Sequence, residues 1–154
     1  MSLIVGIEKC KVDANGRFKF PSALKKQLLP IEDNRFVVRG SIYNPCLELW
    51  PYDRFQEEVA LLQSKLNLYD ANQKRLYRKL TEANLTELDN SDRLLIPMEQ
   101  KRLAKLSKDI VLISAGKYIE LWDAETYHEL DNDQFDYQAA AFTFLTDNNT
   151  TETK

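Results

Sequence analysis

The 154-residue sequence has few of the residues that build metal sites and disulfide frameworks. It contains two cysteines, Cys10 and Cys46, and a single histidine, His128. Both cysteines lie within apolar stretches, and no Cys or His stands near His128 at the spacing of zinc ligands. We therefore expect no metal and no other cofactor, with both cysteines as small core residues and His128 on a solvated helix.

Long apolar runs are missing as well. No stretch approaches the roughly 20 apolar residues that cross a bilayer, and residues 1–6 lack the regions of a signal peptide. The sequence also has no glycine-rich phosphate loop and no nucleophile motif. These absences predict a cytoplasmic protein that is neither a membrane protein nor an enzyme, and that has no small-molecule substrate.

Charge is distributed unevenly along the chain. The formal net charge is −3, but residues 120–154 carry nine carboxylates and one lysine, a net charge of −8. Residues 1–119 consequently have a net charge of +5. A modest positive excess is usually a solvated surface, so charge alone leaves nucleic-acid binding open. Residues 131–154 form an acidic C-terminal tail that can mask such a surface.

The sequence contains an internal repeat. Residues 13–21 (DANGRFKFP) match residues 89–97 (DNSDRLLIP), with Asp, Arg and Pro in register. A second match follows in the same order, between LELW at 47–50 and IELW at 119–122. Two matches in the same order argue for a duplicated structural unit.

Each copy has the same expected layout of a strand, an Asp-x-x-x-Arg turn, a second strand, a short helix and two more strands. Strands are expected at 4–12, 35–39, 46–50, 84–88, 110–114 and 118–122. In the first turn, Asn15 and Gly16 supply two residues that tolerate the positive φ of tight hairpins. Ser91 and Asp92 must do the same, less easily, in the second turn.

A helix is expected after the second strand of each copy. Pro21 and Pro97 suit a first helical turn, because proline has a fixed φ and lacks the N–H that is unsatisfied there. The apolar residues of these helices are spaced so that they face a core. They are Leu24 and Leu28 in the first copy, and Leu103 and Leu106 in the second.

A helical spacer separates the copies, with an apolar stripe at Phe55, Val59, Leu62 and Leu66 and a second helical run at 70–80. We favour packing of this stripe across the body, and subunit contacts by leftover apolar surface are the alternative. One copy cannot bury a core alone, so the two should form one domain. Its expected parts are repeat one at about 5–55, the spacer at about 56–82 and repeat two at about 84–127, within a single pseudo-symmetric barrel at 1–130.

These motifs resemble the MraZ family. The first copy does so through residues 13–17 with Pro21 and through residues 42–51, and the second through residues 88–97, 111–113 and 118–123. The resemblance covers about residues 5–130, and the tail lies outside it. One residue departs from the family pattern, Asp92, which stands where glycine is usual and places a negative charge beside Arg93.

The resemblance implies an α+β, mainly β fold, a duplicated swapped-hairpin barrel of the AbrB/MazE-like type with short helices. It also implies a repressor that binds double-stranded DNA through short direct repeats in the promoter of the division and cell-wall gene cluster. Members of the family assemble into rings. We therefore expect a cytoplasmic, nucleoid-associated homo-oligomer.

The repeated turn suits DNA recognition. A turn between two strands can hold Arg17 or Arg93 rigidly, so that the guanidinium pairs with guanine or grips phosphate. Asp13 and Asp89 would be repelled by phosphate, so we expect them to orient the turns through hydrogen bonds. Lysines on the flanking strands can neutralise phosphates. The expected DNA-binding set is Arg17, Arg93, Lys9, Lys11, Asn15 and Lys19.

The sequence leaves two other classes of function open. A protein-binding module of the MazE-like type would use the acidic tail to hold a basic partner. An enzyme would need chemistry from Asp13 and Asp89, which pseudo-symmetry can bring together, but two carboxylates alone specify no reaction. The recurrence of the arginine turn favours DNA binding over both.

Overall fold

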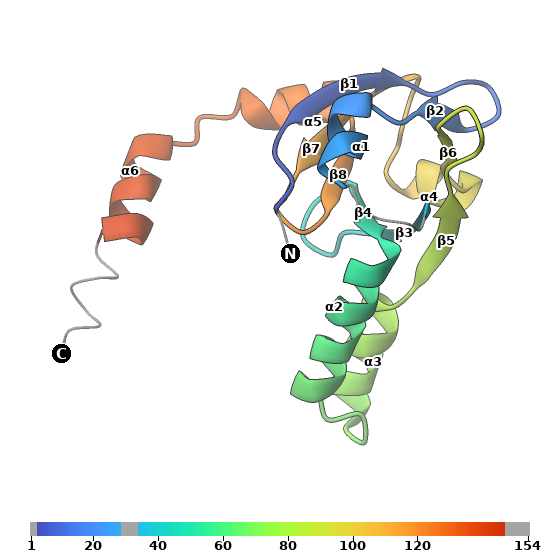
Figure 1. Ribbon diagram of the computed structural model, residues 1–154. Coiled ribbons are helices and arrows are strands. Elements are labelled where there is room, and N and C mark those ends of the chain that lie inside the picture. The colour runs from blue at the N-terminus through green and yellow to red at the C-terminus, as the bar shows by residue number, and fades with distance from the viewer. Residues whose placement is uncertain (1–2, 29–33, 147–154) are drawn as a thin grey trace.

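The computed structural model describes residues 3–28 and 34–146 and shows the expected order of elements in both repeats (Figure 1). The first repeat comprises β1 (Ile7–Lys11), β2 (Arg17–Lys19), α1 (Ser22–Gln27), β3 (Arg35–Gly40) and β4 (Leu47–Pro51). The second comprises β5 (Ala83–Glu87), β6 (Arg93–Leu95), α4 (Met98–Leu103), β7 (Asp109–Ser114) and β8 (Ile119–Asp123). Between them lie α2 (Tyr52–Lys65) and α3 (Ala71–Leu80), and after them α5 (Ala124–Asp131), α6 (Tyr137–Ala141) and the π-helical turn η1 (Phe142–Thr146). No helix within the described ranges is long and apolar enough to span a membrane.

The two repeats exchange strands. One antiparallel sheet has the order β1-β7-β8-β4-β3-β5, and a small second sheet consists of β2 and β6. The first strand of each repeat thus pairs with the third strand of the other, β1 with β7 and β5 with β3, while the two second strands pair with each other. This arrangement confirms the α+β class with mostly antiparallel strands, and it makes neither repeat complete without the other.

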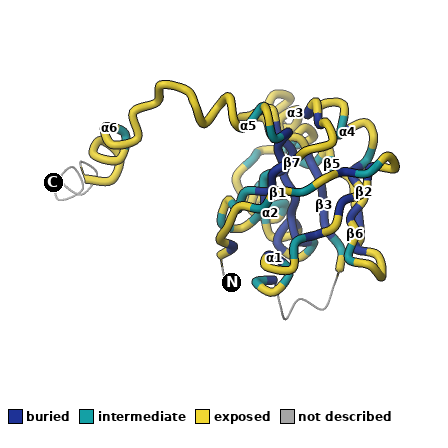
Figure 2. Tube along the Cα trace, turned by 90° about the horizontal axis from the view of Figure 1, so that it is seen from above, coloured by how far each residue is buried: buried dark blue, intermediate teal, exposed yellow. Residues whose placement is uncertain are grey.

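The main apolar core lies inside these strands (Figure 2). Phe18 of β2 and Leu94 of β6 are fully buried in it, directly opposite each other. Burying such a side chain contributes about 1.5–3 kcal/mol. Because side chains alternate along a strand, this burial directs the neighbours of Phe18 and Leu94 outward, including Arg17, Lys19 and Arg93.

The core-facing positions differ between α1 and α4. Leu24 and Leu28 are buried as predicted, and so is Leu106, but the prediction for Leu103 is wrong, since Leu103 is 62% exposed. The helix α4 ends at Leu103 and the chain turns at Lys105, so Leu106 enters the core beyond the helix. Gln100, 5% exposed, faces inward instead and donates from Nε2 to the Val38 carbonyl at 2.6 Å.

The prolines lie one position earlier than expected. Pro21 and Pro97 are the N-cap residues of α1 and α4, with the extended ψ values of 132° and 138°, and therefore precede the first helical turn. In both helices the proline carbonyl accepts a helical hydrogen bond, from Lys25 and from Lys101. The fixed φ of proline still sets the start of each helix.

The helices α2 and α3 form a hairpin that projects from the body (Figure 1). Only its root packs on the large sheet, where Phe55 meets Trp50 edge-on at 5.9 Å between ring centroids. Farther out, Leu61, Tyr69 and Leu76 are exposed. The predicted stripe therefore packs on the sheet through Phe55 and Val59, while Leu62 and Leu66 are only half-buried.

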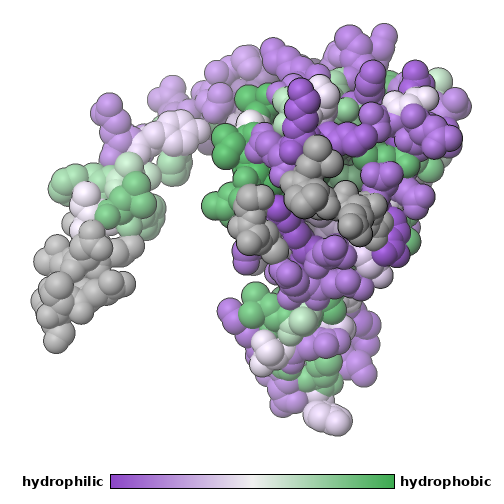
Figure 3. Space-filling view, in the orientation of Figure 1, coloured by the Kyte–Doolittle hydropathy of each residue, from purple (hydrophilic) through white to green (hydrophobic). Residues whose placement is uncertain are grey.

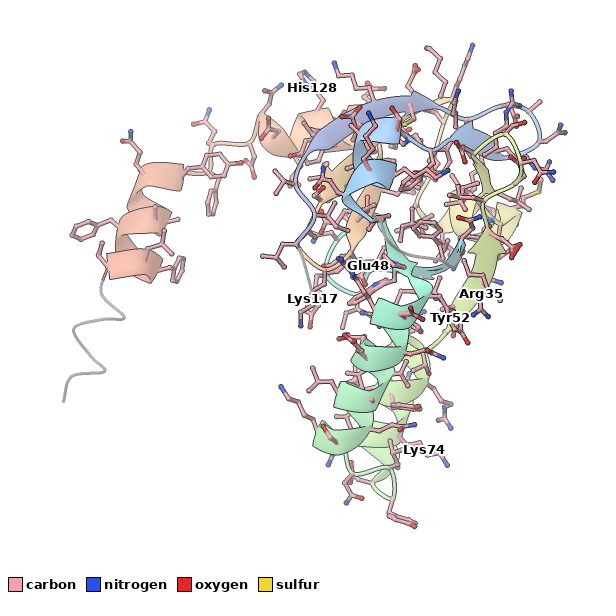
Figure 4. The ribbon with its side chains drawn as sticks, viewed as in Figure 1. Arg35, Glu48, Tyr52, Lys74, Lys117 and His128 are labelled. Carbon is pink, nitrogen blue, oxygen red and sulfur yellow. The ribbon has the colours of Figure 1, made fainter. Side chains whose placement is uncertain are left out.

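A buried arginine joins the hairpin to the sheet. Arg39 of β3, 5% exposed, donates from Nε to Glu48 at 2.7 Å and from a terminal nitrogen to the Leu80 carbonyl at 2.6 Å. Its other terminal nitrogen contacts Glu58 of α2 at 3.2 Å. Glu48, labelled in Figure 4, also accepts the indole N–H of Trp50 at 3.0 Å. The root of the hairpin therefore depends on one satisfied charge network.

We predict that Arg39→Met lowers the free energy of unfolding by about 3–5 kcal/mol, because Glu48 is left as a buried charge without its counter-ion. Urea denaturation measures this loss. The double replacement Arg39→Leu/Glu48→Leu should recover most of it, since no charge then stays buried. A single variant within about 1 kcal/mol of the parent would show that the network does not hold the hairpin.

Candidate nucleic-acid interface

The first Asp-x-x-x-Arg turn is held by its aspartate. One carboxylate oxygen of Asp13 accepts the backbone N–H groups of Asn15 and Arg17, both at 2.9 Å. The backbone N–H of Asp13 donates to the Arg17 carbonyl at 2.8 Å, and its carbonyl accepts from Gly16 at 3.0 Å. The loop is therefore a turn closed by a residue with positive φ, Gly16 at +84°.

The second turn repeats this geometry. One carboxylate oxygen of Asp89 accepts the N–H groups of Ser91 at 2.8 Å and Arg93 at 2.9 Å. Asp92 occupies the position of Gly16 with a φ of +60°. The expectation of two positive-φ residues in each turn is wrong, because each loop has three residues between Asp and Arg and only the third is left-handed.

Backbone hydrogen bonds fix the two turns against each other. The N–H of Phe20 donates to the Asp92 carbonyl, and the N–H of Ile96 donates to the Gly16 carbonyl, both at 2.8 Å. Between these bonds β2 and β6 pair in the register Arg17 to Leu95 and Lys19 to Arg93. The structure thus brings Arg17, Lys19 and Arg93 together on the outer face of one small sheet, with Asn15 exposed at the tip of the first turn.

The charges on this face are paired unequally. Arg93 lies 3.6 Å from the carboxylate of Asp13, across the two repeats. Within the part of the chain that the structure describes, no carboxylate lies in ion-pair distance of Arg17 or Lys19. Arg17 and Lys19 are thus available to an anionic ligand, while the ion pair with Asp13 orients the side chain of Arg93.

Asp92 has a partner that the sequence did not reveal. Lys25 of α1 donates to the Asp92 carboxylate at 2.7 Å, so the extra negative charge of the second turn is compensated from the other repeat. The two residues are 67 positions apart, and only the exchange of strands brings them together. Asp92 therefore neutralises Lys25, whose charge would otherwise add to the positive surface of the turns.

Lys9 and Lys11 lie in the other sheet. Their side chains lie two residues apart and therefore share one face of β1. Both line a hollow of about 910 Å³ together with Tyr127 and His128 of α5. Lys11 is paired with Asp109 at 2.8 Å. The structure therefore groups Lys19 with the two arginines and groups Lys9 and Lys11 with α5.

The described residues also include the two cysteines and the single histidine of the sequence. Burial raises the pKa of Cys10 to about 11 and that of Cys46 to about 12, so both thiols stay protonated at neutral pH. The imidazole of His128 contacts Asn132 on the surface of α5. Among the described residues, no three His, Cys, Asp or Glu side chains are grouped so that they could hold a metal ion.

Comparisons with known proteins agree with the resemblance of the turns. A family model named MraZ, which describes MraZ proteins as antitoxin-like, matches residues 80–147. The match runs past Leu130, so α6 and η1, which we expected to lie outside the resemblance, fall within it.

Three curated relatives each carry the name Transcriptional regulator MraZ. The protein of Christiangramia forsetii is 37% identical over 134 residues, covering 86% of both chains. That of Mycoplasmoides gallisepticum is 34% identical, covering 87% of this chain and 91% of its own. That of Alkalilimnicola ehrlichii is 33% identical, covering 85% of this chain and 87% of its own.

The two turn aspartates should titrate at unusually low pH. Hydrogen bonds from the backbone N–H of Arg17 lower the pKa of Asp13, and those from Arg93 lower the pKa of Asp89. Because the folded-state pKa is lowered, the stabilisation of each turn is present above the ordinary aspartate pKa and is lost as pH falls through the folded value. We predict that NMR titration places both carboxyls below 3.8.

The variant Asp13→Asn is the matched control for this titration. It keeps an acceptor oxygen but has no charge to titrate. The pH-dependent shift of the Arg17 amide should therefore disappear, while that of Arg93 persists. Titration of both carboxyls at or above 3.8 would contradict the assigned hydrogen bonds.

Proposed function

Because this chain belongs to the MraZ family of transcriptional regulators, we propose that it binds double-stranded DNA with the outer face of β2 and β6. One observation carries this proposal. The two Asp-x-x-x-Arg turns, far apart in the sequence, are bonded side by side and present Arg17, Lys19 and Arg93 on one exposed face.

The proposed contacts follow from the chemistry of each group. The planar guanidinium of Arg17 donates two parallel hydrogen bonds and matches the O6 and N7 acceptors of guanine in the major groove. Arg93, which Asp13 steers at 3.6 Å, supplies a second such fork. Lys19 contacts phosphate and adds affinity without reading sequence, and the exposed amide of Asn15 can bond a base edge.

Asp13 and Asp89 orient the site without touching DNA. Each accepts two N–H groups of its own turn, so its negative charge is directed into the turn. Lys9 and Lys11 belong to a separate sheet, and we assign them only a general attraction for phosphate.

We further infer that the exchanged pairing belongs to a swapped-hairpin barrel of the AbrB/MazE-like type, which the pairs β1 with β7, β2 with β6 and β3 with β5 support. The protein then acts in the cytoplasm, at the nucleoid, as a repressor of the promoter of the division and cell-wall gene cluster. It binds direct repeats as a homo-oligomeric ring, because several turn pairs bound at once raise the effective concentration of each.

A protein-binding module of the MazE-like type is the rival function. The described residues after Asp131 include the carboxylates Asp133 and Asp136 and are almost entirely exposed, which suits a basic protein partner. That function would leave the paired arginine turns without a role, so we rank it second.

The variant Arg17→Ala/Arg93→Ala tests the proposed function. Each bidentate arginine–guanine pair provides about 1–3 kcal/mol of discrimination. We predict that the double variant binds the DNA upstream of its own gene no better than scrambled DNA, at least a hundredfold more weakly than the parent. Fluorescence anisotropy at several salt concentrations measures both affinities.

The control variant Lys65→Ala/Lys117→Ala also removes two positive charges, but at positions outside the turns. It should lower affinity for both DNAs slightly and equally, because it affects only the general field. A folded double arginine variant that keeps its preference for operator DNA would contradict the site. Tight copurification of a basic protein with no DNA preference in the parent would favour the rival function.

A separate prediction concerns Asp92. Replacing it by glycine removes a negative charge from the second turn, frees Lys25 and suits the positive φ of this position. Asp92→Gly should therefore bind DNA more tightly, with a salt dependence steeper by about one phosphate contact. The conservative Asp92→Asn, which removes only the charge, should give part of the gain. Unchanged affinity in both variants would show that this turn does not face DNA.

A further inference from the structure

The chain ends in an arm that stands apart from the body. We call residues 132–146 the arm. It contains α6 and η1, and almost every residue in it is exposed (Figures 1 and 2). Its exposed side chains include Phe135, Tyr137, Phe142 and Leu145, and Figure 3 shows hydrophobic surface, coloured green, in the region of α6. Large exposed apolar clusters on a soluble protein mark interaction surfaces.

The arm is also acidic. It carries Asp133 and Asp136 and has no lysine or arginine, and Asp131 precedes it directly. The partner of the arm should therefore combine apolar and basic surface.

The α2–α3 hairpin has both properties. The helix α3 bears Lys74, Arg75, Arg78 and Lys79, has no carboxylate, and exposes all four cations. Lys79 contacts Glu82 at 3.6 Å. Within the described residues, Lys74, Arg75 and Arg78 form no ion pair. Figure 4 shows Lys74 on the part of the hairpin that projects from the body.

A hollow at the root of the hairpin offers apolar surface. It measures about 420 Å³ and has no charged residue in its lining. Leu85 is exposed at its rim on β5, an edge strand of the large sheet. Arg78 lies three residues before Thr81, which also lines the hollow. Its principal apolar lining residues are Val37, Tyr52, Phe55, Val59, Ala83 and Leu85.

We propose that the arm of one copy docks on the α2–α3 hairpin of a second copy, with its carboxylates against the cations of α3 and its aromatic side chains at the hollow. Charge complementarity selects this occupant, since residues 131–146 carry three carboxylates and no lysine or arginine, whereas α3 carries four cations and no carboxylate. The inference rests on the proposed homo-oligomer and names the surfaces that would build it.

The position of the two surfaces sets the symmetry of the contact. The arm and the hairpin leave the body in different directions (Figure 1), so each copy offers one surface as donor and a different one as acceptor. Such heterologous contacts run head to tail and close into a ring when the rotation between copies permits. The hairpin cations then serve assembly, and the DNA surface on β2 and β6 stays open.

Charge reversal tests the contact. Asp131→Lys/Asp133→Lys reverses the charge of the last residue of α5 and of the first carboxylate in the arm, and it leaves Asp136, which caps α6, in place. Arg75→Glu/Arg78→Glu reverses the helix. We expect each variant to lower the mass measured by light scattering to that of the single chain, 18.0 kDa, and we expect the quadruple variant to recover the parent's mass.

Two control variants carry charge reversals of the same size at sites outside the proposed contact. Glu125→Lys/Glu129→Lys and Lys26→Glu/Lys108→Glu should leave the mass unchanged. A third variant, Phe142→Ser/Leu145→Ser, removes apolar surface without altering charge, and since both residues are exposed it should fold and yet dissociate.

The contrary outcomes are distinct. Unchanged mass in both charge-reversed variants, or no recovery in the quadruple variant, would overturn the contact. Loss of DNA affinity in Arg75→Glu/Arg78→Glu at constant mass would make α3 a DNA surface instead. The proposed function is tested separately, because dissociated variants should still bind a single DNA repeat weakly in a manner that depends on Arg17.

Discussion

The pairing of β2 with β6 is the constraint on which the core and the candidate DNA surface both depend. It joins a strand of each repeat, places Phe18 opposite Leu94 in the core, and sets Arg17, Lys19 and Arg93 on the other side. A shift of one residue would exchange the two faces. The cross-repeat bonds at Gly16 and Asp92 oppose such a shift, so the face that carries the arginines is determined by the same interactions that bury the core.

Duplication produced two similar units whose differences are informative. Across the β3–β4 pair Arg39 stands opposite Glu48, whereas across the corresponding β7–β8 pair Ile113 stands opposite Glu120. The Arg39–Glu48 network therefore lies in the repeat whose sheet carries the root of the helical hairpin. Likewise Gly16 has Asp92 as its counterpart, and a lysine from the other repeat compensates the added charge. These asymmetries place the support of the hairpin and the proposed recognition surface of the turns on different residues.

Much of this architecture follows from the sequence. The repeated Asp, Arg and Pro positions, the alternating strands and the turn-orienting role of Asp13 and Asp89 were predictable, since each depends on interactions within a few residues. The burial of Gln100 in place of Leu103 was not, because it depends on where α4 ends and on the Val38 carbonyl of another element. The Lys25–Asp92 pair and the grouping of Lys9 and Lys11 with α5 were also hidden, because they arise from strand exchange.

The proposed site rests on Arg17 reading guanine from a turn held in place by Asp13. A double-mutant cycle between protein and DNA measures this contact: operator guanines are replaced one at a time by 7-deazaguanine, which lacks the N7 acceptor, and binding of the parent and of Arg17→Ala is compared. At the guanine that Arg17 contacts, the replacement weakens binding of the parent severalfold and leaves the affinity of Arg17→Ala unchanged, whereas replacement of a guanine that Arg93 contacts weakens both. Equal losses in parent and variant at every operator guanine would contradict the account.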